Sequence, residues 1–231
     1  MMSSHRLPSR RRFLEASALA FGSRLLGQVP GDRPKQDASV KVLNPRARVP
    51  VSIIIDDSTC LVNLNKFAIP QFAAANPGMY DHYPWKSWSD EIPDDFVRKF
   101  ADWATENGLK GKYSIVPYPA CVGRLDLQIP GWTQQELKSS IDLVRERIMP
   151  NWDIHPEMVT HTRVINTKTG HPYPEISPRF MENWKWCGGR SVDEIADYMH
   201  YGLTILKNIG LPCEGVTTPG GFGTDNRKSV V

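Results

Sequence analysis

Four short, largely apolar runs alternate along the chain with three longer segments whose apolar residues recur every three or four positions. The runs are residues 51–55, 112–116, 157–160 and 214–217, and the longer segments are 94–107, 133–148 and 191–209. Short runs of this kind predict buried strands, and the longer periodic segments predict amphipathic helices. Because strands and helices alternate with short returns, the pattern predicts a parallel α/β sheet or barrel.

Capping residues mark where two of the predicted helices begin. Thr133 is followed three residues later by Glu136, and Ser191 stands in the same relation to Glu194. In such a capping box each side chain satisfies a backbone N–H group of the other residue at the start of the helix. Gly108 follows the segment 94–107 and supplies its end.

Residues able to carry chemistry follow each predicted strand. They are Asp56, Asp57, Tyr118, His161 and Pro219. Parallel strands joined by right-handed crossovers place all their carboxyl ends on one face, and active sites of α/β folds are built there. We therefore expect these residues to gather at one edge of the sheet.

The adjacent carboxylates and the distant histidine indicate a metal site. Asp56 and Asp57 repel each other, so a nearby cation would lower the cost of ionising both. Carboxylates with a histidine suit a divalent metal that keeps an open position for water. His155 and His82 are further candidate ligands. The alternative is a solvated turn after the first strand, with structural histidines elsewhere.

An aromatic segment lies in the long stretch 59–92, for which we predict no regular element. Its residues 80–88 include Trp85 and Trp88, whose ring faces could stack on sugars in a substrate groove. The alternative is a loop pinned to the body by its own aromatic side chains.

Three short motifs at successive strand ends, residues 53–58, 160–162 and 218–221, resemble those of the polysaccharide deacetylase family. That resemblance implies a distorted (β/α) barrel and a metal-dependent carbohydrate esterase. It makes Asp56 the catalytic base and makes Asp57 and His161 ligands of a divalent metal, for which we expect Zn²⁺. It places Pro219 and Gly221 in the substrate groove, where we also expect Tyr118.

The chain departs from the family pattern at several positions. Ser58 replaces a glycine, Ile165 stands where a second metal-binding histidine is expected, and Thr217 stands where an arginine normally holds the base. The later family motifs, a carboxylate and a Leu-x-His, are not found before Val231. We therefore expect residues 51–231 to form an incomplete barrel, truncated at its C-terminal end.

The function expected from these features is removal of acetyl groups from an acetylated polysaccharide by an exported, metal-dependent hydrolase. Two alternatives remain open. One is a non-catalytic carbohydrate-binding relative of the family, which the departures favour. The other is a glycoside hydrolase on a related barrel, which needs a second strand-end acid about 5–10 Å from the first.

The N-terminal segment predicts export. Residues 9–14 place Arg10 and Arg11 before two large apolar residues, which resembles the twin-arginine export signal, although Glu15 stands where lysine is usual. We expect an export signal at 1–31, a linker at 32–50 and a periplasmic or extracellular protein that meets the twin-arginine machinery. A basic disordered tail is the alternative. No run approaches the roughly 20 apolar residues of a membrane helix.

Charge and composition narrow the remaining classes. The net charge is +3, but residues 1–31 hold five arginines and one glutamate, or +4, which leaves −1 for the rest. The body therefore offers no charge argument for nucleic-acid binding. A hydrophobic content of 40% excludes a wholly disordered chain. The four cysteines lack metal-finger spacing, and their pairing is open.

Overall fold

Three parallel strands form the main sheet, in the spatial order β1 (Ile53–Ser58), β2 (Gly111–Ile115) and β3 (Trp152–Pro156). The computed structural model describes residues 39, 41, 49, 51–213 and 215–223. The predicted export signal at 1–31 and most of the predicted linker lie outside these residues. The mixed α/β class and the parallel pairing predicted from the sequence are confirmed.

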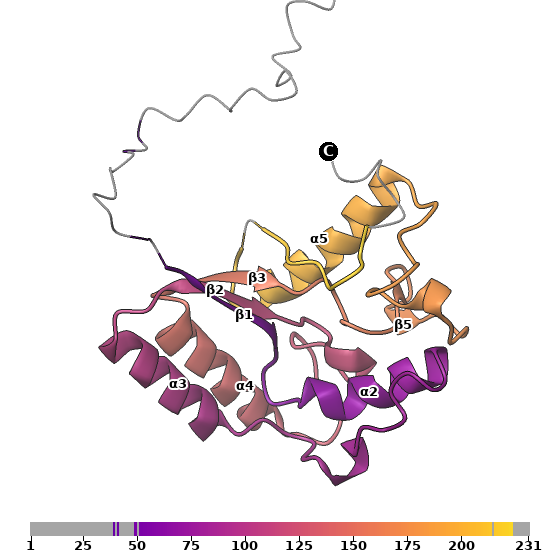
Figure 1. Ribbon diagram of the computed structural model, residues 1–231. Helices are drawn as coiled ribbons and strands as arrows, with labels where there is room; N and C mark the ends of the chain where they lie inside the picture. The colour runs from indigo at the N-terminus through magenta and orange to yellow at the C-terminus, as the bar shows by residue number, and fades with distance from the viewer. Residues whose placement is uncertain (1–38, 40, 42–48, 50, 214, 224–231) are drawn as a thin grey trace, which may run out of the picture. The chain divides into compact units, whose positions relative to one another are not determined.

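The three predicted helices are present as α3 (Asp94–Glu106), α4 (Gln134–Leu143) and α5 (Val192–Asn208). Both predicted capping boxes form, at the starts of α4 and α5. A π-helical turn, η3 (Val144–Ile148), continues α4, so together they span the predicted segment. In Figure 1, α3 and α4 lie side by side on one side of the sheet.

Two predicted strands differ from the structure. The third strand lies at Trp152–Pro156 instead of 157–160. This strand contains polar residues, but its alternate side chains, those of Trp152, Ile154 and Pro156, are buried. Residues 157–160 follow the strand instead. The predicted strand 214–217 is reduced, over its described residues, to a parallel bridge between Thr217 and Glu157.

Further short elements lie between the predicted ones. Helix α2 (Leu64–Ala75) contains Pro70 and occupies part of the stretch for which the sequence predicts no element. The others are η1 (Trp85–Ser87), η2 (Pro119–Cys121), β4 (Ile165–Asn166), β5 (His171–Pro172) and η4 (Pro178–Phe180). The strands β4 and β5 form an antiparallel pair.

The two faces of the main sheet differ in chemistry. One face contributes Tyr113, Ile115 and Ile154 to a core that also holds side chains from α3, α4 and α5. Because successive side chains of a strand alternate between faces, Lys112 and Ser114 point to the other face. The described residues do not close this sheet into a barrel. They also include no helix that is both long and apolar enough to cross a membrane.

Candidate metal centre

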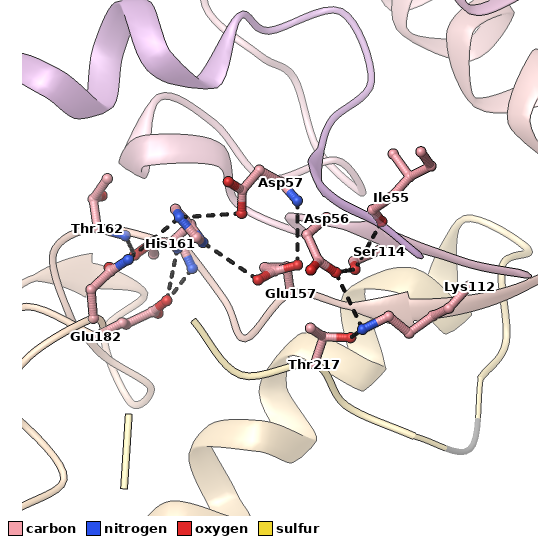
Figure 2. Close-up of polar contacts among 12 residues, drawn as sticks. Ile55, Asp56, Asp57, Lys112, Ser114, Glu157, His161, Thr162, Glu182 and Thr217 are labelled. Carbon is pink, nitrogen blue, oxygen red and sulfur yellow. Dashed lines mark hydrogen bonds and ion pairs between the residues drawn. The ribbon is translucent and has the colours of Figure 1, made fainter. Parts of the chain in front are cut away.

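Three side chains able to ligate a metal meet at the carboxyl edge of the sheet. Asp57 lies near the end of β1, Glu157 directly follows β3, and His161 lies in the turn after Glu157. One possible ligand atom from each lies within 4.8 Å of the other two. Figure 2 shows the three side chains directed toward one another. The group therefore spans the edge of the sheet from its first strand to its third.

The distances within the group are short. Asp57 Oδ1 lies 3.3 Å from His161 Nε2, and Glu157 Oε1 lies 3.8 Å from His161 Nδ1. The Asp57 backbone N–H donates to Glu157 Oε2 over 3.3 Å. The side chain of Asp57 is 52% exposed, whereas those of Glu157 and His161 are 3% and 12% exposed. Solvent therefore reaches the group from the side of Asp57.

The backbone bends at the residues that bring these side chains together. Asp57 and His161 both have φ of 60°. Met158, which lies between Glu157 and His161 in the chain, has φ of 47°. Such left-handed conformations of residues other than glycine cost on the order of 1–3 kcal/mol each, and they cluster at functional sites. At Asp57 the bend coincides with a break in the register between β1 and β2. The fold thus maintains strain where the candidate ligands converge.

Burial dominates the electrostatics of the group. Burial, and then the charge of Asp56, raise the pKa of Asp57. Burial also raises the pKa of Glu157 and lowers the pKa of His161. Each shift favours the neutral form of its group, and a bound cation would reverse the effect on the carboxylates.

The donor atoms fit a divalent cation. His161 Nδ1 is buried and has no hydrogen-bond partner among the described residues. A buried polar atom without a partner is costly, and coordination would satisfy it. Carboxylate oxygens and an imidazole nitrogen are ligands that Zn²⁺ takes in proteins.

Asp56 lies beside the group but has different partners. Its Oδ1 accepts a hydrogen bond from Ser114 Oγ over 2.8 Å and lies 3.2 Å from Lys112 Nζ. Lys112 in turn donates to Thr217 Oγ1 over 3.0 Å. The lysine therefore holds this carboxylate from the second strand, as Figure 2 shows. Sequence reasoning missed Lys112, although parallel pairing of the first two strands would have placed it opposite Ile54, two residues before Asp56.

The other histidines considered from the sequence lie outside the group. His155 Nε2 pairs with Asp153 Oδ2 at 2.9 Å, and the ring covers Gly215 so closely that a Cβ there would lie 2.6 Å from it. The His82 ring packs on Tyr83, with ring centroids 4.2 Å apart.

Glu157 completes the group instead of a second histidine. Ile165, at the position where the resemblance expects that histidine, is buried in a core cluster. Sequence reasoning missed Glu157 because it placed the third strand five residues too late. Because β3 ends at Pro156, Glu157 is the first residue after the strand, where candidate site residues are expected.

The aromatic residues expected in a groove are half-buried and pack against core clusters. Trp85 and Trp88 pack against the core cluster around α2, with Lys66 and Lys86 near the Trp85 ring. Tyr118 packs against the cluster that contains Tyr198 and Trp186, and its N–H donates to Val159 O over 2.8 Å. This packing is also what the alternative, a segment pinned by its own aromatic side chains, predicts for Trp85 and Trp88. Their role in a groove stays a prediction.

Gly221 approaches the candidate ligand His161 through one intermediate residue, Asn183. A Cβ at Gly221, where φ is 86°, would lie 2.3 Å from the backbone oxygen of Asn183. The side-chain nitrogen of Asn183 lies 3.4 Å from His161 Nε2. Pro219 is buried and accepts a hydrogen bond from the Phe222 N–H. The motif expected to line the groove thus approaches the histidine.

A cavity of about 310 Å³ lies beside the group. Its lining includes Asp56 and Asp57, polar residues between β1 and α2, and apolar residues of α3 (Phe96, Val97 and Phe100). The lining includes none of the five residues expected in the groove.

Comparisons with protein-family models, curated proteins and solved structures find no match to this chain.

Proposed function

We propose that this protein is an exported, metal-dependent hydrolase that removes acetyl groups from an acetylated polysaccharide. The observation that carries the proposal is the convergence of Asp57, Glu157 and His161 beside a carboxylate, Asp56, that is held separately. The proposed scaffold is an incomplete (β/α) barrel of the polysaccharide deacetylase type, of which the parallel sheet is the described part.

Asp57, Glu157 and His161 would hold the divalent ion, and Zn²⁺ fits their donor atoms. The ion, when bound, supplies Lewis acidity toward the acetyl carbonyl and makes a water molecule more acidic. Glu157 and His161 are buried, so they would form the inner wall of the site. The exposed Asp57 would lie on the side from which substrate arrives.

Asp56 is the proposed general base. Lys112 and Ser114 both contact its Oδ1, which leaves Oδ2 as the atom that takes a proton from the attacking water. In the family that the sequence resembles, an arginine at the position of Thr217 holds the base. Here Thr217 contacts Lys112, and Lys112 contacts the base, so the two residues together would do the work of that arginine.

The two alternative functions predict different products. A carbohydrate-binding relative would bind an acetylated glycan and release nothing. A glycoside hydrolase would release new reducing ends, using Asp57 and Glu157 as its acid pair. The burial of Glu157 and its hydrogen bond from the Asp57 backbone favour a ligand over a substrate-contacting acid.

The location is part of the proposal. The twin arginine at Arg10 and Arg11 would direct the folded protein to the periplasm or beyond. Because the twin-arginine machinery carries folded proteins, a metal could be inserted in the cytoplasm before export.

The experiment measures metal binding and acetate release on the same preparations. Wild-type protein is stripped with a chelator, titrated with Zn²⁺ by calorimetry, and assayed for acetate and reducing ends on acetylated glycans. Asp57→Ala, Glu157→Gln and His161→Ala should each lose metal affinity and acetate release. Asp153→Asn is the matched control, because this sheet acid pairs with His155 outside the group. A wild type that binds no divalent metal and releases no acetate would refute the proposal.

A further inference from the structure

A further carboxylate, that of Glu182, lies behind the candidate ligands and is not one of them. The Glu182 side chain is fully buried, with 0% of its surface exposed. Its Oε1 accepts the backbone N–H of Thr160 over 2.9 Å, and its Oε2 accepts the backbone N–H of His161 over 2.7 Å. The hydroxyl of Tyr198, from α5, also donates to Oε1. Burying a carboxylate is costly, and these three donors compensate for the loss of water.

The two backbone donors are consecutive, and this follows from the shape of the turn. Successive N–H groups of a bent backbone point into one concavity, which binds anions. The left-handed conformation of His161, with φ of 60°, forms this bend. One carboxylate group can therefore hold both N–H groups only while the turn keeps its strained shape.

The backbone of Glu182 reinforces the same turn. Its N–H donates to the carbonyl oxygen of Thr162 over 2.8 Å. Glu182 thus contacts three consecutive residues, Thr160 to Thr162, through both side chain and main chain. Figure 2 shows Glu182 on the far side of His161 from Asp57. The histidine ring is therefore flanked by the candidate ligands, while its backbone is fixed from behind.

We infer that Glu182 is a positioning residue for the metal centre, whose buried carboxylate clamps the 160–162 turn and so fixes the direction of the His161 ring. The inference rests on the proposed function, since it assigns the clamp to a metal ligand. Glu182 would act through the backbone of His161 and would contact neither metal nor substrate. Groups that orient a metal ligand typically change metal affinity by about 10–100-fold when they are altered.

The test combines metal affinity with a measurement that needs no metal. Glu182→Gln keeps the size of the side chain but turns one acceptor into a donor that faces a backbone N–H group. We expect its dissociation constant for Zn²⁺ to rise about 10–100-fold. In metal-free protein labelled with [15N]histidine, we expect the His161 amide to exchange at least about tenfold faster, measured against the His200 amide within α5.

Two further variants separate positioning from general destabilisation. Ile148→Val, a core change in η3, should lower stability without changing Zn²⁺ affinity or the relative exchange of the His161 amide. Tyr198→Phe removes one donor to the carboxylate and should give a smaller shift of both readouts. It also serves as the test if Glu182→Gln does not fold.

The outcomes are distinguishable. Unchanged relative exchange at His161 in Glu182→Gln, or in Tyr198→Phe if the first variant does not fold, overturns the clamp. Faster exchange with wild-type Zn²⁺ affinity overturns the positioning role. A wild type that binds no divalent metal and releases no acetate overturns the proposed function and with it the assignment to a metal ligand, whereas the exchange experiment still decides whether Glu182 holds the turn.

Discussion

Replacing Gly202 by alanine tests how closely α5 packs against the turn that carries Glu157 and His161. A Cβ at this position would lie 2.5 Å from the carbonyl oxygen of Met158. That oxygen belongs to the backbone, so it cannot swing away as a flexible side chain could. Met158 is further fixed by its φ of 47° and by the hydrogen bond from its N–H to Thr217 O, 2.8 Å long. The added methyl group must therefore displace either the helix or the turn.

Two opposing free energies set the size of the effect. Alanine is better than glycine inside a helix by about 1 kcal/mol. Overpacking a well-filled site costs typically about 1–3 kcal/mol, and the rigid backbone partner places Gly202→Ala at the upper end. We therefore expect the free energy of unfolding to fall by a net of about 1–2 kcal/mol. For a domain of this size, the fall in Tm would be about 2–8 °C.

Urea and thermal denaturation of the metal-free protein measure this difference. His200→Ala is the control, because it gives α5 a better helix former on an exposed position and adds no contact. We expect the control to be as stable as wild type or slightly more stable. A Gly202→Ala protein that matches or exceeds wild type would contradict the reasoning, and would mean that the turn yields to the helix at little cost.

Three further predictions concern the proposed base Asp56, the Cys60 thiol and the predicted export signal. Lys112→Met should reduce acetate release about 10–100-fold, because Lys112 holds the proposed base Asp56. Its Tm should change little, because the ion pair is partly exposed and such pairs contribute at most about 1 kcal/mol. Lys138→Met, which breaks a surface ion pair on α4, is the control, and equal losses of acetate release in both variants would contradict this role of Lys112. Burial raises the pKa of Cys60 to about 12 from an ordinary value near 9, so ionisation favours the unfolded chain and stability should fall as pH rises from 9 toward 12. Urea midpoints at pH 8 and pH 10.5 measure that fall, which should be smaller in Cys60→Ala; an equal fall in both proteins would exclude Cys60 as its source. Replacing Arg10 and Arg11 by lysine should keep the protein in the cytoplasm, and unchanged periplasmic recovery on fractionation would disprove the export signal.

Periodicity predicted the elements whose burial pattern is regular. The helices α3, α4 and α5 each have one apolar face and local start or stop residues, so their positions follow from the sequence. Helix α2 was missed because Pro70 lies inside it, and proline normally ends a helix. Its apolar residues pack against Met181 and Ala120, which are distant in the chain, so tertiary packing supplies what the local pattern lacks.

The sequence predicted only those residues of the candidate site that follow a predicted strand. Asp57 and His161 follow strands along the chain, and their convergence was expected from parallel topology. Glu157 and Glu182 could not be found in this way. The first depends on where β3 ends, and the second on a turn with left-handed residues, which are uncommon at any residue other than glycine. Their positions become evident only when the long-range contacts are known.

The spacing of the three candidate ligands has a consequence for the mechanics of unfolding. Asp57 and Glu157 are 100 residues apart in the chain, and the intervening segment contains α2, α3, α4 and β2. An ion held between them would act as a removable cross-link across this whole loop, in a protein whose described cysteines form no disulfide with one another. In the chain-entropy description, closing a loop of 100 residues stabilises a fold by about 4.7 kcal/mol. Access to metal would then determine how long the protein resists unfolding and proteolysis, independently of any turnover.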